Sequence, residues 1–144
     1  MEDFPVELME LNPEKHSDGW WVTAAELDVR QVAQVMLTRQ VRLVTMTATA
    51  RPGGETDVIY HYAAAGVTYN LKTTTRANSL PSISVLLPAA NWIEREIHDL
   101  FAVQFEGHPN LARLVRPPET PEGFYRQPGG AASREKAPAP ERKA

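Results

Sequence analysis

The sequence predicts an α+β fold of two layers: a mostly antiparallel mixed sheet packed against two main helices, followed by an extended C-terminal tail. Residues 41–75 alternate with the period of two that is typical of strands and are rich in β-branched side chains. Residues 24–38 and 90–101 instead place apolar side chains at helical spacing. These two periodicities predict the sheet and the helices that cover it.

The first helix is predicted over residues 24–38. Thr23 and Glu26 fit a capping box, in which each side chain bonds the backbone amide of the other residue. The core-facing stripe of this helix consists of Val29, Val32, Ala33 and Met36. Residues 1–19 read as an irregular segment with one short helical turn, and residues 20–22 as a brief strand or a hydrophobic plug.

Three strands are predicted to form a meander. Residues 41–50 and 56–64 flank the turn signal Arg51-Pro52-Gly53-Gly54 and form a hairpin, and residues 67–75 form the third strand. Residues 76–81 are predicted as a loop. The alternation of Ile83, Val85 and Leu87 suggests a fourth strand, although a helical turn leading into the second helix is the alternative because two prolines bound this short run.

The second helix has one apolar side, made by Ile93, Ile97, Leu100 and Phe101, and a polar remainder. Glu94 and Glu96 point about 200° apart on a helix, so they cannot act on one substrate as an acid–base pair. A solvated or intersubunit charged face is therefore predicted here. Val103 and Phe105 then alternate as in an extended segment, which ends in a turn at residues 107–109.

Composition excludes several kinds of function. The 144 residues are enough for one domain, and the net charge of −3 with no basic stripe argues against nucleic acid as a partner. No cysteine is present, which excludes disulfides and thiolate-bound metal clusters on this chain. No apolar run approaches the roughly 20 residues of a membrane-spanning helix. With an acidic N-terminus in place of a basic signal peptide, we expect a cytoplasmic protein.

The candidate sites have ordinary structural interpretations. His98, Asp99 and His108 lack the i, i+3 or i, i+4 spacing of metal-binding helices, so no metal site is predicted. His108 is expected to bond backbone groups of its own turn or a partner, and His61 to be a satisfied sheet histidine. Gly53-Gly54 precedes no helix and cannot form a phosphate site. Trp92 is expected either at an interface or in the core.

The region of the second helix resembles a known family. Glu94-Arg95-Glu96, Asp99, Phe105, Gly107-His108-Pro109 and Arg113 resemble the signature of the 30 kDa subunit of respiratory complex I. The same module occurs in the related energy-converting NiFe hydrogenases. Further similarity lies at Tyr60-His61, Pro81-Ser82 and the Pro88–Trp92 run, while the first half of the chain is similar only in general pattern.

The resemblance implies a structural subunit with no active site, cofactor or metal on this chain. It would dock on a large NiFe-hydrogenase-like subunit, with a small iron–sulfur subunit beside it; clusters and any NiFe centre would be on these partners. The complex would be an ion-translocating oxidoreductase held on the inner face of the cell membrane through partner subunits. The predicted interface residues are Trp92, Glu94, Arg95, Glu96, Asp99, Phe105, Gly107, His108, Pro109, Arg113, Phe124 and Tyr125.

The sequence departs from the family pattern in three places. Ala102 replaces a common glycine after the helix, which calls the left-handed helix end into question. Ala112 replaces the first of two arginines, and the usual tail with a tryptophan and a His-Pro-Leu-Arg-Lys run is absent. The last two features favour a hydrogenase-type complex over an NADH:quinone oxidoreductase. The sequence does not identify the electron donor, the electron acceptor or the pumped ion.

Two further expectations concern the chain as a whole. Residues 1–116 are predicted to form the folded domain, and residues 117–144, dense in Pro, Gly, Ala and charges, a disordered tail in which Phe124-Tyr125 anchors a neighbouring subunit. The alternative from another functional class is a free-standing small hydrolase or binding protein that uses the His61 and Glu94 regions.

Overall fold

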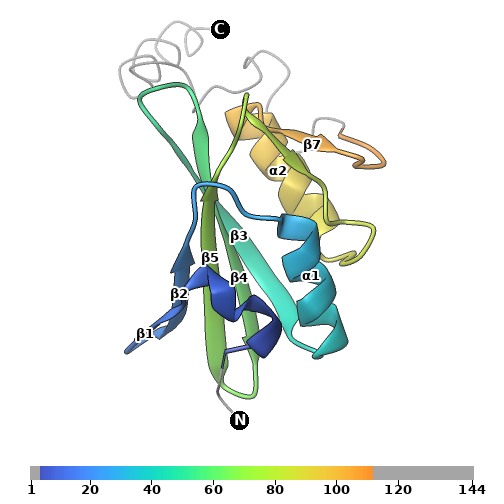
Figure 1. Cartoon of the computed structure of the whole chain (residues 1–144). Helices are drawn as coiled ribbons and strands as arrows, with labels where there is room; N and C mark the ends of the chain where they lie inside the picture. The colour runs from blue at the N-terminus through green and yellow to red at the C-terminus, as the bar shows by residue number, and fades with distance from the viewer. Residues whose placement is uncertain (1–3, 112–144) are drawn as a thin grey trace, which may run out of the picture.

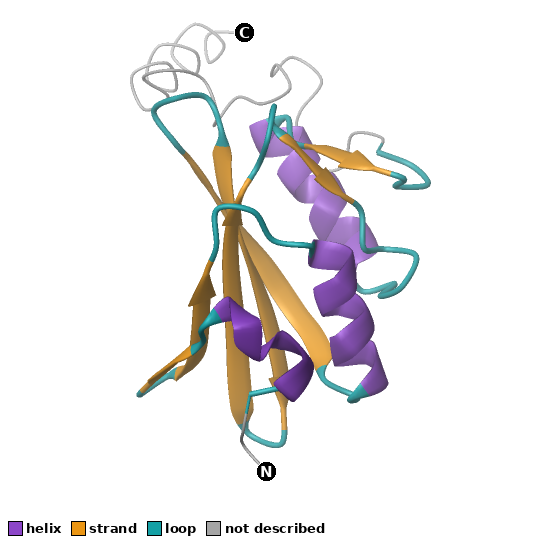
Figure 2. Cartoon of the chain, viewed as in Figure 1, coloured by secondary structure: helices purple, strands orange, loops and turns teal. Residues whose placement is uncertain are grey.

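The computed structural model describes residues 4–111 and shows a five-stranded sheet with both α-helices on one face (Figures 1 and 2). The strand order is β1-β2-β5-β4-β3. The strands are β1 (Glu14–His16), β2 (Gly19–Thr23), β3 (Arg42–Ala50), β4 (Thr56–Ala64) and β5 (Val67–Thr74). β2 runs parallel to β5 and every other pair is antiparallel, which confirms the predicted mixed sheet.

The predicted meander is confirmed as β3-β4-β5. Across β4 and β5, Tyr60 is opposite Leu71 and Tyr62 is opposite Tyr69, and all four side chains are buried. Because side chains alternate across a strand, His61 and its partner Asn70 lie on the other face of the sheet. The tyrosine face is the one that packs against the helices.

Helix α1 (Val29–Thr38) begins five residues later than predicted. Its N-cap is Asp28, whose side chain accepts a hydrogen bond of 3.0 Å from the backbone N–H of Gln31. The capping box at Thr23 and Glu26 was a wrong prediction, because Thr23 ends β2 and the carboxylate of Glu26 pairs with Arg76 instead. The predicted core stripe is confirmed, with Val29, Val32, Ala33 and Met36 all buried.

The N-terminal segment contributes a 3₁₀ helix, η1 (Val6–Leu11), which confirms the short helical turn predicted there. Its Leu8 is buried, and the ring of the preceding Phe4 lies 5.7 Å from that of Trp20 and 6.1 Å from that of Tyr69. This segment therefore closes the core near β2 and β5. Residues 20–22, left open as a strand or a plug, belong to strand β2.

A second sheet has two strands, one before and one after the helix at residues 90–101. β6 (Ser79–Pro81) pairs in parallel with β7 (Gln104–Glu106), so part of the predicted loop 76–81 is a strand. The strand predicted at residues 83–87 is wrong and the helical-turn alternative is correct, since Leu87 N–H bonds Ile83 C=O at 2.8 Å. The physical reason is that the Glu94 carboxylate accepts a hydrogen bond from the Ile83 N–H, the group that a strand ladder would need.

Helix α2 (Ala90–Phe101) matches the predicted range and packs beside β3. It ends at Ala102, which has φ 59° and ψ 25° and donates its N–H to His98 C=O. The left-handed helix end that alanine called into question is therefore present. No helix within residues 4–111 has the length and apolar character needed to cross a membrane.

Replacing Ala102 by glycine is expected to stabilise the chain by about 1 kcal/mol, because the left-handed conformation places an alanine Cβ too close to the following carbonyl. The measurement is urea unfolding of the full chain. Ala63→Gly, at a strand position of β4, is the control and should lower stability. An unchanged or lowered stability of A102G would contradict the strain assigned to Ala102.

Candidate docking site on helix α2

The structure divides the predicted interface residues into exposed and buried ones. Exposed on the surface are Trp92, Glu96, Gly107 and Pro109, with Arg95 half-buried between them. Buried are Glu94, Asp99, Phe105 and the side chain of His108. Arg113, Phe124 and Tyr125, like the predicted tail, lie outside the described residues. These four side chains are therefore not at the surface of the domain in this conformation, and the interface role of the whole set stays a prediction.

The exposed part of the site is a small face on α2, which we call the Trp92 face: Trp92, Arg95 and Glu96. Trp92 keeps 64% of its surface exposed, so the core interpretation of this tryptophan is wrong. The guanidinium carbon of Arg95 lies 5.3 Å from the centre of the Trp92 ring, within cation–π range. An aromatic ring and an arginine held together at the surface are the side chains that concentrate binding energy in protein interfaces.

Glu94 supports this face from inside the domain. Its carboxylate is fully buried and accepts hydrogen bonds from Ser82 Oγ at 2.6 Å and from the backbone N–H of Ile83 at 2.9 Å. The charged-face interpretation was wrong for Glu94, because position 94 lies on the side of α2 that packs against the 82–84 turn. Burial raises the pKa of Glu94 to about 7, although the hydrogen bonds from Ser82 and Ile83 and the nearby Arg30 act in the opposite direction.

Two tyrosines of β4 complete the surroundings of Glu94. The hydroxyls of Tyr60 and Tyr62 are buried without a hydrogen-bond partner in the described residues. Burial raises the pKa of both phenols well above its usual value, and the Glu94 carboxylate raises both further. Sequence reasoning named Tyr60 only for its family resemblance and did not predict that these two hydroxyls face Glu94. Their signal was the alternation Tyr60-His61-Tyr62, which places two hydroxyls on the core face of a strand.

Arg30 of α1 ties the neighbouring segments together. Its guanidinium donates to Ser82 C=O at 3.0 Å and to Glu106 C=O at 2.9 Å. A side chain at Gly107 would meet the same guanidinium at 2.8 Å, and the φ of Gly107 is +87°. The Gly-His-Pro turn therefore needs glycine for its backbone conformation, and a Cβ at this position would also displace the Arg30 guanidinium. Nothing in the local sequence around Arg30 indicates this role, since its bonds span more than fifty positions.

His108 bonds backbone groups, as predicted. Its Nε2 lies 3.0 Å from Asn91 C=O and its Nδ1 accepts from the N–H of Asn110 at 2.9 Å. Nε2 is also 3.9 Å from the Glu94 carboxylate. The turn after β7 is thereby fastened to the first turn of α2, at the residue that precedes Trp92. His98 similarly contacts the backbone, with Nδ1 2.9 Å from Val103 C=O.

His61 lies on the opposite face of the sheet from the tyrosines that face Glu94. Its ring nitrogens contact Thr47 Oγ1 at 2.8 Å and Asn70 Oδ1 at 2.7 Å, which confirms a satisfied sheet histidine. His61 and Glu94 therefore do not share a site, and the hydrolase alternative is not supported. Among residues 4–111, no group of three or more His, Cys, Asp or Glu side chains is arranged to hold a metal ion.

Comparisons with known proteins find segments of similar sequence in proteins named for NADH-quinone oxidoreductase or NADH dehydrogenase. A segment of an NADH-quinone oxidoreductase protein of Methylococcus capsulatus is 42% identical over 71 residues, covering 46% of this chain and 12% of that protein. A smaller NADH-quinone oxidoreductase protein of Methylobacterium sp. is 39% identical over 82 residues, covering 54% and 36%. The Candida albicans "NADH dehydrogenase [ubiquinone] iron-sulfur protein 3, mitochondrial" is 38% identical over 93 residues, covering 62% and 32%. The chain thus spans only a part of these relatives.

Two solved structures share the fold. A trypsin-resistant fragment of Nqo5 superposes with a TM-score of 0.59 at 24% identity, covering 73% of this chain and 96% of that one. A chain of the membrane-bound sulfane sulfur reductase, described as an archaeal respiratory membrane complex, gives a TM-score of 0.64 at 23% identity, covering 78% and 75%. The model of the respiratory-chain NADH dehydrogenase 30 Kd subunit matches residues 22–131, and the chain belongs to that family.

Proposed function

We propose that this chain is a structural subunit of a membrane-bound redox complex and docks through the Trp92 face on a large hydrogenase-like subunit. The observation that carries the proposal is the exposed Trp92 ring, held by Arg95 on the helix that also bears the family signature. Family membership supports the assignment to a redox complex. In this role the chain holds no cofactor or active site, and the iron–sulfur clusters belong to its partners.

Such a subunit contributes by holding its neighbouring subunits in a fixed relative position. Electron-transfer centres and active sites on neighbouring subunits depend on geometry, and a displacement of about 1 Å can cost ~100-fold in rate. A helix fastened on its inner side by Glu94 and His108 provides a rigid surface for this purpose. The chain would reach the inner face of the cell membrane through its partner subunits.

Within this proposal we favour a hydrogenase-type complex, in which electrons pass to protons. Ala112 and the lack of the usual tail motif support this preference. The curated relatives described above carry names of NADH–quinone enzymes, which supports the other type. The test is the sequence of the large subunit that co-purifies with a tagged chain. Paired nickel-ligating cysteines in that subunit would establish the hydrogenase type, and their absence would reject it.

Arg95→Glu is expected to reduce co-purification of the complex at least about tenfold, because it reverses a charge at the centre of the docking face and removes the cation–π contact. Assembly should fall more than the stability of the isolated chain, whose melting temperature is measured in parallel because Arg95 is half-buried. Affinity purification followed by quantitative mass spectrometry provides the measurement. Lys15→Glu on β1 is the matched charge reversal and should leave assembly unchanged. Full assembly of R95E with an active complex would contradict this docking role.

A further inference from the structure

Strand β3 is the last strand of the five-stranded sheet and pairs only with β4 within residues 4–111. The backbone groups on its outer side therefore lack partners in the described sheet. Bare strand edges bind other chains readily, and natural proteins usually cover or charge them. The outer side of β3 is thus a candidate for covering by another polypeptide.

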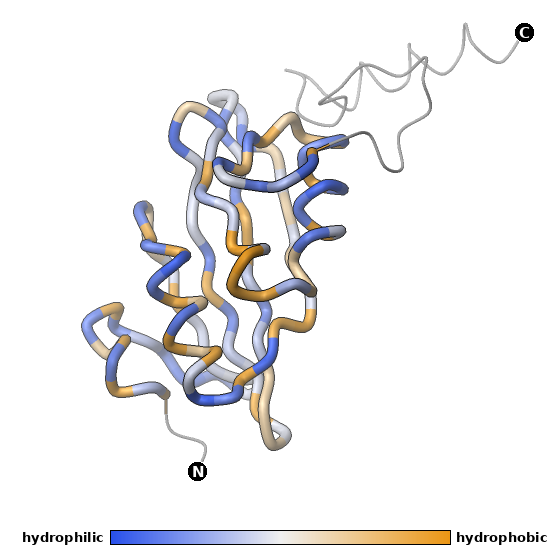
Figure 3. The backbone as a smooth tube through the Cα atoms, turned by 90° about the vertical axis from the view of Figure 1, so that its right-hand side faces the viewer, coloured by the Kyte–Doolittle hydropathy of each residue, from blue (hydrophilic) through white to orange (hydrophobic). Residues whose placement is uncertain are grey.

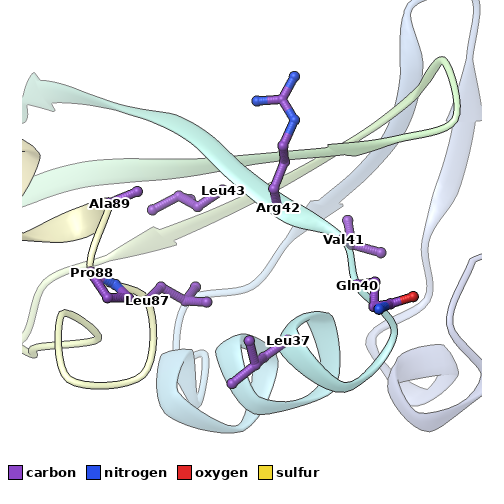
Figure 4. Close-up of a pocket in the computed structure, with 8 residues that line it drawn as sticks. All are labelled: Leu37, Gln40, Val41, Arg42, Leu43, Leu87, Pro88 and Ala89. Atoms are coloured by element: carbon purple, nitrogen blue, oxygen red, sulfur yellow. The ribbon is translucent and has the colours of Figure 1, made fainter.

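Two hollows follow this edge, one after the other. The first, of about 390 Å³, lies where Leu37 of α1, Val41 just before β3, Leu43 of β3 and Leu87 meet (Figure 4). The second, of about 290 Å³, lies between residues 45–48 of β3 and the Glu96 and Leu100 side chains of α2. Both hollows are lined by consecutive parts of the same strand, and we refer to the two together as the edge groove.

The edge groove exposes apolar side chains. Leu37, which lines the first hollow, keeps 44% of its surface exposed, and Val44, which lines neither hollow but lies between the β3 residues that do, keeps 46%. Figure 3 shows hydrophobic positions gathered in the stretch of backbone that runs between the two helices. The pairing of β3 with β4 shifts register between Leu43 and Thr45, so Val44 is the bulged residue. Regular pairing on the outer side is therefore available from Thr45 to Ala50.

Two charges flank the edge groove. Arg42 is exposed and points away from the apolar side chains of the first hollow (Figure 4). Glu96 is exposed and lines the second hollow. Neither side chain forms an ion pair or hydrogen bond with any part of the chain that the structure describes. A strand laid along β3 would meet Arg42 on the outer face of the sheet and Glu96 on the helix face, because strand side chains alternate between faces.

We propose that the edge groove receives an extended segment of another subunit of the complex, which adds to β3 as a further strand. The segment would place a large apolar side chain in the first hollow and a basic side chain near Glu96, both on the helix face. On the opposite face it would carry an acidic side chain near Arg42. Backbone hydrogen bonds to residues 45–50 would provide affinity. The apolar, basic and acidic side chains of the added segment would provide specificity.

A second copy of this chain fits the edge groove poorly. Strand β3 contains no acidic residue, so its own edge cannot supply a carboxylate opposite Arg42. Its large inward side chains, Leu43 and Met46, are already buried in the core of their own domain. The inference rests on the proposed function, because it takes the occupant from the complex in which this chain is a subunit.

Photo-crosslinking of the intact complex tests the inference. The chain has no cysteine, so Val44→Cys gives it a single thiol, which is labelled with a benzophenone maleimide on the isolated chain before the complex is assembled, because the cluster-bearing partners contain cysteines of their own. We expect the label to cross-link to one segment of another subunit that carries the predicted apolar, basic and acidic residues. Adding Arg42→Glu should reduce the cross-link yield about threefold, because it sets like charges opposite each other. Val6→Cys, at the 69% exposed Val6 of η1, is the control for unspecific labelling.

The outcomes separate this inference from the proposed function. A Pro109→Cys label, at the exposed turn that His108 fastens next to Trp92, that cross-links to the large subunit, together with a Val44→Cys label that yields no product, overturns the edge groove and leaves the docking role intact. Cross-links from position 44 to a second copy, or to residues 112–144 of the same chain, also overturn it. If the chain purifies alone and neither label captures a partner, the proposed function fails and this inference fails with it.

Discussion

Glu94→Gln is expected to remove much of the loss of stability that the chain undergoes between pH 5 and pH 8. Burial raises the pKa of Glu94 from 4.5 to about 7, so the folded chain keeps this proton after the unfolded chain has released it. Stability from this group is fully present below pH 4.5 and declines as the pH rises to 7. A pKa shift of this size lowers the free energy of unfolding at pH 8 by about 3 kcal/mol relative to its value below pH 4.5.

The measurement is the free energy of unfolding in urea across this pH range. Glutamine keeps an oxygen for the Ile83 N–H and can donate its amide to Ser82 Oγ, so the variant and the parent should agree at pH 5. They should separate toward pH 8, where the variant becomes more stable. Glu96→Gln changes an exposed carboxylate two residues away and should leave the parent slope unchanged. Equal slopes for E94Q and the parent would contradict ionisation of a buried Glu94.

Glu94 also illustrates how far sequence reasoning extends at this site. The hydrophobic periodicity of α2 predicted its ends correctly, because Ile97 and its neighbours fix the face that packs on β3. Periodicity assigned Glu94 to the polar side, because it treats every carboxylate as solvent-seeking. The burial of Glu94 depends on Ser82 and on the Ile83 N–H, which belong to a turn that the alternation of residues 83–87 disguised as a strand.

In the sheet, too, the features encoded by neighbouring residues were predicted, and those that depend on residues distant in the sequence were not. The hairpin β3-β4 and strand β5 follow from period-two patterns and turn residues, which are local signals. The start of α1 was predicted too early, because Thr23 and Glu26 match a capping box locally while β2 needs Thr23 as its last residue. Parallel pairing of β2 with β5 joins segments about fifty positions apart, and no local pattern encodes such a pairing.

Asn78→Ala is expected to destabilise the chain by about 3–4 kcal/mol, the combined effect of lost buried hydrogen bonds and backbone strain. The Asn78 amide nitrogen donates to Phe101 C=O at 3.1 Å and to Ala102 C=O at 2.8 Å, at the end of α2. Its amide oxygen accepts from Thr56 Oγ1 at 2.9 Å. One buried side chain thus joins the start of β4 to the C-terminus of α2. Its removal leaves the Thr56 hydroxyl and the helix carbonyls without these partners.

The backbone at Asn78 has φ 53°, so alanine also adds the strain of the left-handed conformation. Asn12→Ala separates the two effects, because Asn12 has φ 56° but is exposed, and its side chain makes no hydrogen bond to residues 4–111. Asn12→Ala should therefore cost only about 1 kcal/mol in the same urea titration. The difference between the two variants measures the buried hydrogen bonds. Amide hydrogen exchange should rise at the C-terminal turn of α2 in N78A alone, since that turn loses its attachment to the sheet. Equal effects of N12A and N78A would mean that strain accounts for the whole loss and that Asn78 does not hold the helix in place.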